Sequence, residues 1–338
     1  MREIIITSND SGRRLDRFLR KYLPGASLSE VYKAIRKDIK VDGKRRNESY
    51  ILNEGEVLTL YLTDEALDRF GAGSRKSNRG GQAKRTFGTV YEDDNVLMVS
   101  KPFGLLTHGD SHEKKDHLAN QVKDYLIETG SYDPRSEKVF VPAPVNRLDR
   151  NTTGIVLFGK TAAAMRELSR MIREDDIRKF YLTIACGVVE KEMHLGGSLV
   201  KDEEANKVEI LSGDAGKEIE TIVRPLEVLH FGGGLTATLC EVELVTGRSH
   251  QIRAHLASTG HPLIGDSKYA TKGAAAVNNY IKTNYGLTTQ LLHADRIEFL
   301  DSAAGSESLG YLAGMAFDAP VPKRFREIFT GLGGKYIY

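Results

Sequence analysis

The feature that most limits the fold of this chain is a stretch poor in apolar residues, which divides it into two unequal parts. From Asp64 to Arg85 the sequence consists largely of Gly, Ser, Arg and Lys and shows almost no apolar periodicity. Such a composition is typical of a flexible linker. We therefore predict a flexible basic linker over residues 64–86, a small domain over residues 1–63 and a larger domain over residues 87–338.

Length and charge agree with this division. At about 150 residues per domain, the 338 residues of the chain suffice for two domains. The formal net charge is only +2, but residues 1–86 carry 19 Lys and Arg against 12 Asp and Glu. Their net charge is therefore +7, which leaves −5 for the rest of the chain. The total charge thus conceals a basic N-terminal region.

Cysteine content and the N-terminus both favour a cytoplasmic location. Cys186 and Cys240 are too few for a disulfide framework, and both lie in apolar runs typical of strands. The first ten residues contain only the short apolar run Ile4–Ile6, far below a signal-peptide core or a membrane span. We expect a protein of the reducing cytoplasm that does not associate with membranes.

The N-terminal part has the pattern of a compact α+β module. Apolar residues at helical spacing predict two helices, one beginning near Leu15 and one near Ser29. The run 39–44 predicts a strand with a tight Asp-Gly turn, and the run 57–62 predicts another strand.

Basic side chains gather on the second helix and the turn of this module. They are Lys33, Arg36, Lys37, Lys40, Lys44, Arg45 and Arg46. A charge run of this kind is often only a solvated face. Tyr32 within the cluster and the basic segment behind it favour binding to RNA.

In the larger part, predicted strands outnumber helices and do not alternate with them. Strand-like runs occur at residues 138–145, 154–159, 180–190, 206–211, 218–229 and 235–246. Helical patterns occur at residues 115–129, 161–174 and 249–259. This order predicts an α+β body with a mainly antiparallel sheet rather than a doubly wound one.

Two local patterns suggest chemistry that their context does not support. The run Gly154–Thr161 satisfies the P-loop spacing G-x4-G-K-[ST] of nucleotide-binding proteins. Its four intervening residues are Ile-Val-Leu-Phe, which favour a buried strand over an open phosphate-binding loop. Three histidines with two aspartates, His108, Asp110, His112, Asp116 and His117, match neither a zinc finger nor the helical H-E-x-x-H pattern. We interpret this second run as a polar loop.

Two polar clusters are better candidates for a site. In the first, residues 145–154, Asp149 lies between Arg147 and Arg150, an arrangement that suits an ionised carboxylate near a phosphate-bearing ligand but equally suits a salt-bridged turn. In the second, residues 246–255, a strand ends and a helix begins with Ser249 as its expected N-cap. Arg253 on that helix could lie beside an acid, or on a solvated face.

The two clusters, with other motifs in the same order, resemble the RluA-type RNA pseudouridine synthases over about residues 88–300. The motifs are Lys101-Pro102-Phe103-Gly104-Leu105, Arg147-Leu148-Asp149-Arg150, Lys179-Phe180-Tyr181-Leu182, Thr246-Gly247-Arg248-Ser249-His250-Gln251-Ile252-Arg253, Gly260-His261-Pro262-Leu263-Ile264-Gly265-Asp266 and Leu291-Leu292-His293-Ala294. One departure is Asn146, where the family usually has a histidine. Residues 12–62 resemble the small RNA-binding domain of small-subunit ribosomal protein four, which this family attaches to such a body.

The resemblance implies an isomerase that flips a uridine out of RNA, breaks its glycosidic bond and rejoins the base through carbon five. It implies Asp149 as the catalytic carboxylate, either as nucleophile or as the base that removes a ribose proton. Arg253 would hold Asp149 ionised and Tyr181 would stack on the flipped base. Arg147 and Arg150 would contact phosphates or fill the vacated space.

The same resemblance implies no metal and no other cofactor, and RNA as the partner. The sequence carries no signal for oligomeric state, and we expect a monomer. The attached domain favours large-subunit ribosomal RNA over tRNA as substrate. Two other functions stay open: an RNA-binding protein whose catalytic site has decayed, and an NTPase that uses the run Gly154–Thr161.

Overall fold

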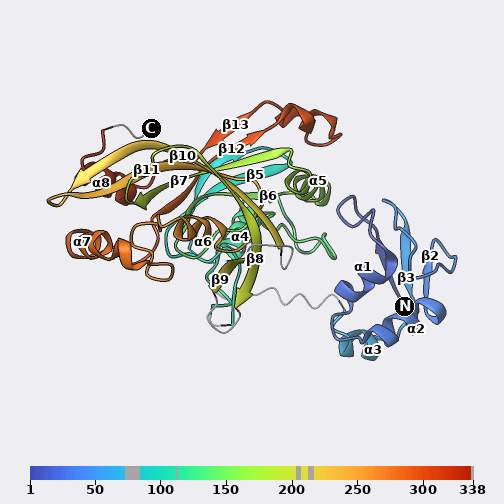
Figure 1. Ribbon diagram of the computed structural model, residues 1–338. Coiled ribbons are helices and arrows are strands. Elements are labelled where there is room, and N and C mark those ends of the chain that lie inside the picture. The colour runs from blue at the N-terminus through green and yellow to red at the C-terminus, as the bar shows by residue number, and fades with distance from the viewer. Residues whose placement is uncertain (73–83, 112, 203–206, 212–216, 336–338) are drawn as a thin grey trace. The chain divides into compact units, whose positions relative to one another are not determined.

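The computed structural model describes residues 1–72, 84–111, 113–202, 207–211 and 217–335 (Figure 1). Contacts between Cα atoms divide the chain into two compact units. The first unit comprises Met1–Arg85, Ala119–Ala143 and Gly159–Arg166, and the second comprises Thr86–Leu118, Pro144–Phe158 and Glu167–Tyr338. Two segments of the larger predicted domain therefore group with the first unit.

The predicted linker starts too early. Its first residues form helix α3 (Asp64–Arg69), whose N-cap Thr63 accepts a hydrogen bond from the Ala66 N–H at 3.2 Å. Leu67 and Phe70 are buried in the core of the first unit. The prediction was wrong here because two buried apolar side chains anchor a helix that is otherwise polar. Residues 73–83 of the predicted linker lie outside the described residues.

The N-terminal part of the first unit is the expected α+β module. Its elements are β1 (Arg2–Ile5), α1 (Leu15–Tyr22), α2 (Leu28–Lys37), β2 (Ile39–Val41) and β3 (Val57–Leu60). The strands form an antiparallel sheet in the order β1-β3-β2. Ser27 and Glu30 form a capping box at the start of α2, which fixes the helix carrying the basic cluster.

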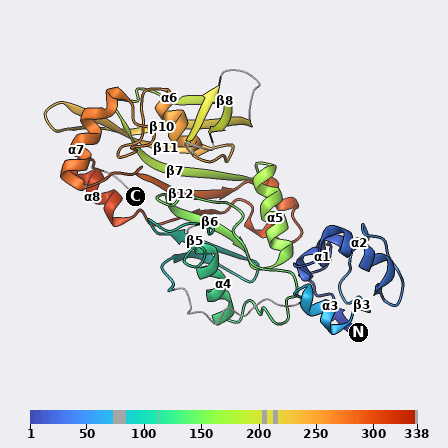
Figure 2. The same cartoon turned by 90° about the horizontal axis from the view of Figure 1, so that it is seen from below.

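The second unit is built on a ten-stranded sheet (Figures 1 and 2). The strands, in order across the sheet, are β4 (Gly88–Glu92), β5 (Val96–Lys101), β6 (Thr153–Gly159), β12 (Leu292–Phe299), β7 (Ile177–Cys186), β11 (Leu235–Leu244), β10 (Lys217–Phe231), β8 (Met193–Asp202) and β9 (Lys207–Leu211), with β13 (Ala316–Asp318) paired to β12. β6 and β12 pair in parallel, whereas β12, β7, β11, β10, β8 and β9 pair successively antiparallel. The predicted α+β class with a mainly antiparallel sheet is confirmed.

Helices pack against this sheet at two places. The helices α7 (Ala275–Tyr285) and α8 (Lys323–Gly331) lie together beside the β10–β11 hairpin in both views (Figures 1 and 2). Their side chains Ile281 and Phe325 share a core with Ile184 of β7 and Leu239 of β11. The helix α6 (Gln251–Ser258) packs against β9 and β10, where Ala254 joins a smaller core. The helix α4 (Leu118–Glu128) belongs almost entirely to the first unit, and the residues of α5 (Ala162–Arg173) are divided between the two units.

Gly154 allows the backbone to pass from the polar loop that carries Asp149 into strand β6 of the sheet. Its φ is +108°, and a Cβ at this position would lie 2.0 Å from the carbonyl oxygen of Ala294 on β12. Only glycine permits this backbone and this close approach. The parallel pairing of β6 with β12 is thereby kept directly after the cluster.

The P-loop interpretation of the run Gly154–Thr161 is contradicted. Every residue from Thr153 to Gly159 is buried in strand β6, so the four intervening residues form no open loop. The structure supports the core strand that their side chains favour, and it leaves no phosphate cradle at this position.

The predicted strand at residues 138–145 is absent. Val139 and Phe140 are buried, but the segment is irregular and makes only an isolated bridge between Pro144 and Phe158. Apolar burial was mistaken here for strand pairing. The prediction also missed strands β8 and β12 and helices α7 and α8.

The polar loop at residues 108–117 is described only in part. Of the polar loop, His108, Asp110, Asp116 and His117 are described and His112 is not. In the described part of the chain, no three His, Cys, Asp or Glu side chains gather as a metal site. Among the same residues, no helix is both long and apolar enough to cross a membrane.

Candidate active site

The two polar clusters of the sequence, about 100 residues apart, meet at one pocket in the second unit. The pocket has a volume of about 200 Å³. It is lined by residues 145–149 and Thr152, Ile172, Lys179, Tyr181, Leu244, residues 247–253 and Leu292. Of the predicted site residues, Arg147, Asp149, Tyr181 and Arg253 are thus brought together. Arg150 is half exposed outside the lining, with its guanidinium 4.0 Å from the Asp110 carboxylate.

Asp149 is the accessible carboxylate of this pocket. Its side chain is 29% exposed, and its Oδ2 accepts a hydrogen bond from Arg253 Nη1 at 3.2 Å. The side chain of Arg253 is only 7% exposed, so the guanidinium faces the carboxylate from a largely dry environment. Arg253 thus pairs with Asp149 and still leaves the carboxylate open to a ligand.

A second carboxylate, which the sequence analysis did not single out, fixes Arg253 from the other side. Asp266 accepts hydrogen bonds from Arg253 Nε at 2.7 Å and Nη2 at 2.9 Å, and its side chain is 1% exposed. It also accepts the backbone N–H groups of Lys268 and Tyr269 at 3.0 and 3.2 Å. Burial lowers the pKa of Arg253, but its bonds to Asp266 and Asp149 outweigh burial and raise the pKa overall. Arg253 is therefore a cation held by two carboxylates.

Tyr181 reaches the pocket from strand β7. Its side chain is buried, and both burial and the charge of Asp149 raise the pKa of its phenol. The hydroxyl therefore keeps its proton at neutral pH. A buried ring on a rigid strand at the pocket wall provides a surface on which a planar base can stack.

The loop that carries Asp149 is held on both sides by residues 101–107. The hydroxyl of Thr107 donates to the Leu148 carbonyl at 2.9 Å and accepts the Leu148 N–H at 3.1 Å. The Gly104 N–H donates to the Arg150 carbonyl at 3.1 Å. These bonds flank Asp149 in the sequence and keep its backbone in place.

Lys101 completes this support from inside the protein. It is fully buried, and its Nζ donates to the carbonyls of Pro102, Leu105 and Arg150 at 3.1, 2.7 and 3.0 Å. Burial lowers the pKa of Lys101 to about 7, while the charge of Asp149 acts to raise it. The lysine belongs to a motif quoted for the family resemblance, but its structural role is visible only in three dimensions.

Asn146, the departure from the family pattern, makes backbone contacts with β6. Its amide N–H donates to the Ile155 carbonyl at 3.3 Å, and its amide oxygen accepts the Leu157 N–H at 2.8 Å. The residue fixes the start of the Asp149 loop on the sheet without an ionisable group. The structure therefore gives Asn146 a supporting position beside Asp149.

His250 is a further group that the sequence analysis did not assign. It is the N-cap residue of α6, where Ser249 had been expected, and it lies in the left-handed region with φ 57°. Its Nε2 lies 3.7 Å from Asp149 Oδ2. No sequence pattern indicates a histidine with positive φ, so only the structure reveals it.

The predicted RNA-binding side chains of the first unit lie on α2, on β2 and in the turn after β2. Lys33, Arg36, Lys37, Lys44 and Arg45 are exposed, and Lys40 is half-buried. Arg46 stacks on the Tyr50 ring at 4.5 Å. The cluster thus has the exposed positive charge that phosphate binding requires.

Comparison with known proteins supports both resemblances inferred from the sequence. Residues 95–258 match the family model for RNA pseudouridylate synthase, and residues 13–58 match the model for the S4 domain. The ribosomal large subunit pseudouridine synthase C of Vibrio cholerae is 30% identical over 89% of this chain and 89% of its own length. The protein of the same name from Escherichia coli is 29% identical over 89% of each chain.

A solved structure also shares the fold. The human RNA pseudouridylate synthase domain containing 4 superposes with a TM-score of 0.53 at 19% identity, covering 73% of this chain and 93% of that one. With the sequence matches, the resemblance inferred from the motifs is confirmed: this chain belongs to the family of RNA pseudouridine synthases and carries an S4 RNA-binding domain at its N-terminal end.

Proposed function

We propose that this enzyme isomerises specific uridines of large-subunit ribosomal RNA to pseudouridine, with Asp149 as the catalytic carboxylate. The observation that carries the proposal is the geometry of Asp149, an accessible carboxylate held by a buried arginine at a pocket. The relatives named as large-subunit synthases support ribosomal RNA rather than tRNA.

The reaction exchanges one bond for another without oxidation or reduction. The bond from N1 of uracil to the ribose breaks, a bond from C5 to the same carbon forms, C5 loses a proton and N1 takes one up. Asp149 acts at the ribose, either by attacking it or by removing a proton from it. Arg253 pairs with the carboxylate and orients it, and Tyr181 holds the detached base against the pocket wall.

The target base must leave its stack to reach this pocket. Extrusion of a base costs a few kcal/mol, which contacts to the displaced strand offset. Arg147 is exposed at the pocket, and Arg150 is exposed beside it. We propose that these two arginines bind the phosphates on either side of the flipped nucleotide.

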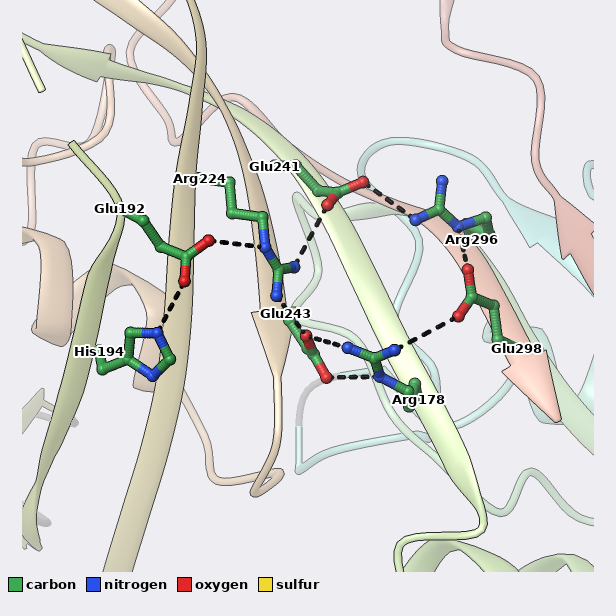
Figure 3. A network of polar contacts seen from close by, with 8 residues as sticks. All are labelled: Arg178, Glu192, His194, Arg224, Glu241, Glu243, Arg296 and Glu298. Atoms are coloured by element: carbon green, nitrogen blue, oxygen red, sulfur yellow. Dashed lines mark hydrogen bonds and ion pairs between the residues drawn. The ribbon is translucent and has the colours of Figure 1, made fainter. Parts of the chain in front are cut away.

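The other face of the sheet is poorly suited to RNA because its arginines are already paired. On β7, Arg178 alternates with the pocket residues Lys179 and Tyr181 and therefore points away from the pocket. Its guanidinium contacts Glu243 at 2.7 and 2.6 Å, and a ladder of ion pairs continues across neighbouring strands (Figure 3). The ladder consists of Arg178, Arg224, Arg296, Glu192, Glu241, Glu243, Glu298 and His194. These carboxylates neutralise the arginines, which supports RNA binding on the pocket face.

Release of tritium from a large-subunit rRNA transcript labelled at C5 of uridine tests the catalytic assignment. We expect the intact enzyme to release tritium and the variant Asp149→Asn to release none, while both bind the transcript equally. Activity of the variant would contradict the role of Asp149. Binding without tritium release by the intact enzyme would favour the decayed RNA-binding protein.

The S4 domain is proposed to supply salt-dependent affinity. In the intact chain, replacement of Lys33, Arg36 and Lys37 by alanine should flatten the dependence of log K on log salt by about one unit for each phosphate that is no longer neutralised. Lys323, 85% exposed on α8, provides the matched control, Lys323→Ala. An unchanged slope in the triple variant would refute the role of the basic cluster.

A further inference from the structure

His250 has an unusual backbone for a histidine. Among the described residues other than glycine, it shares a positive φ only with Asp42 and Asp175. Such a conformation persists where surrounding contacts demand it, and it is concentrated at functional sites. The ring makes no capping hydrogen bond to α6 in the described chain, so helix capping does not explain the conformation.

The ring of His250 is held by a chain of hydrogen bonds that begins on the sheet. The Val208 N–H of β9 donates to the Tyr269 hydroxyl oxygen at 2.9 Å. The Tyr269 hydroxyl lies 3.0 Å from His250 Nδ1, and the two rings pack edge to face with centroids 5.7 Å apart. The hydroxyl accepts from Val208 and can donate its own proton to Nδ1. A neutral imidazole that accepts at Nδ1 carries its proton on Nε2.

The charges around His250 favour the neutral ring. Burial lowers the pKa of His250, and the cations of Arg253 and Lys268 lower it further. The carboxylates of Asp149 and Asp266 act in the opposite direction without reversing the shift. At neutral pH the ring is therefore a hydrogen-bond donor at one nitrogen and an acceptor at the other.

Both donors beside Asp149 face the same oxygen. Arg253 Nη1 lies 3.2 Å and His250 Nε2 lies 3.7 Å from Oδ2. Among the described residues, no hydrogen bond or ion pair to Oδ1 accompanies them. A distance of 3.7 Å is longer than a hydrogen bond, but catalytic hydrogen bonds often shorten when substrate fills the site.

We propose that His250 is a positioning residue that, with its proton on Nε2, donates to Asp149 Oδ2 and so leaves Oδ1 to act on the ribose. This inference rests on the proposed function of Asp149. Two donors on one oxygen fix the rotation of the carboxylate plane, which a single contact from Arg253 does not. Tyr269 takes part indirectly, because its hydroxyl selects the tautomer of His250.

The tautomer can be measured without any activity assay. Selective ¹⁵N labelling of the histidines and long-range ¹H–¹⁵N correlation spectra distinguish a protonated from an unprotonated ring nitrogen. For His250 at neutral pH we expect an unprotonated Nδ1 and a protonated Nε2. In Tyr269→Phe the two tautomers should mix, whereas Tyr280→Phe on α7 should leave the signals unchanged. A proton on Nδ1 of the unaltered enzyme would overturn the proposal, whatever the role of Asp149.

Two replacements of His250 test whether a hydrogen-bond donor is needed at the position of its Nε2. Glutamine can place an amide N–H near the position of Nε2, whereas asparagine tolerates positive φ but is too short. In single-turnover reactions we expect His250→Asn to lose about 10- to 100-fold in rate, as misplacement of a reacting group does, and His250→Gln to retain most of the rate. The RNA concentration for half-maximal rate should change little in either.

Equal rates for His250→Asn and the unaltered enzyme would overturn the proposal. A loss shared by both variants, with unchanged thermal unfolding, would do so too, because it would show that the donor at Nε2 is not what matters. Failure of the proposed function gives a different pattern: Asp149→Asn would remain active while the tautomer of His250 stays as predicted.

Discussion

Arg253 lies between the partly exposed Asp149 and the buried Asp266. We expect Asp266 to contribute mainly to stability and Asp149 mainly to catalysis. Asp266 is 1% exposed and holds two of the nitrogens of Arg253, whereas Asp149 is 29% exposed and holds one at 3.2 Å. The group of three has one positive and two negative charges. Removal of the charge of Asp149 therefore leaves a neutral, fully bonded pair in the interior. Removal of the charge of Asp266 leaves the buried cation with only its weaker partner.

The two asparagine variants should differ sharply in stability. Loss of one partner from a buried ion pair typically costs about 3–5 kcal/mol, and the amide of Asp266→Asn would also oppose donors of Arg253. Asp149 is partly exposed and its loss leaves Arg253 paired with Asp266, so Asp149→Asn should cost only about 1 kcal/mol. The catalytic effect should be reversed in order, since Asp149→Asn removes the reacting group and keeps the fold.

Urea unfolding followed by circular dichroism measures the first quantity, and tritium release under single-turnover conditions measures the second. We expect Asp266→Asn to lower the free energy of unfolding several times more than Asp149→Asn. A larger loss of stability in Asp149→Asn would refute the division of roles. Full activity in Asp149→Asn would refute it as well.

Three further predictions concern stability. Gly154→Ala should cost about 3 kcal/mol or more in urea unfolding, because its Cβ would meet the Ala294 carbonyl at 2.0 Å. Burial, with nearby carboxylates, raises the pKa of Asp295 to about 6, so the folded protein loses stability as the pH rises from about 4 to 6 and this carboxyl ionises. The variant Asp295→Asn should therefore raise the free energy of unfolding by about 2–3 kcal/mol at pH 8 and change it little at pH 4. Burial lowers the pKa of His255 and His293 to about 4, so each histidine should reduce the free energy of unfolding by about 3 kcal/mol as the pH falls from 6.5 to 4. In melting experiments at several pH values, His293→Gln should make this loss smaller.

Sequence patterns were sufficient to predict elements whose own residues determine their conformation. The run after Gly154 is apolar and β-branched, and it forms the buried strand β6. Periodicity failed where burial and pairing differ, as at Val139 and Phe140, which are buried in an irregular segment. It also failed for β12, whose alternation is hidden by the buried His293.

The candidate site could be predicted only in part. Asp149, Tyr181 and Arg253 were found through family motifs, because no local pattern shows that residues 104 positions apart share a hydrogen bond. The tie between Arg253 and Asp266 depends on the packing of α6 and the loop after it. The contact of His250 with Asp149 depends on a positive φ, which the residue type histidine does not predict.

The proposed enzyme converts uridines of large-subunit ribosomal RNA to pseudouridine with Asp149 as its catalytic carboxylate. Chemical mapping of pseudouridines in total RNA tests it directly, using cells that lack the gene and carry either the intact protein or Asp149→Asn. We expect one or a few large-subunit sites to disappear without the gene, to return with the intact protein and not to return with Asp149→Asn. Sites that persist without the gene, or that return with Asp149→Asn, would contradict this claim.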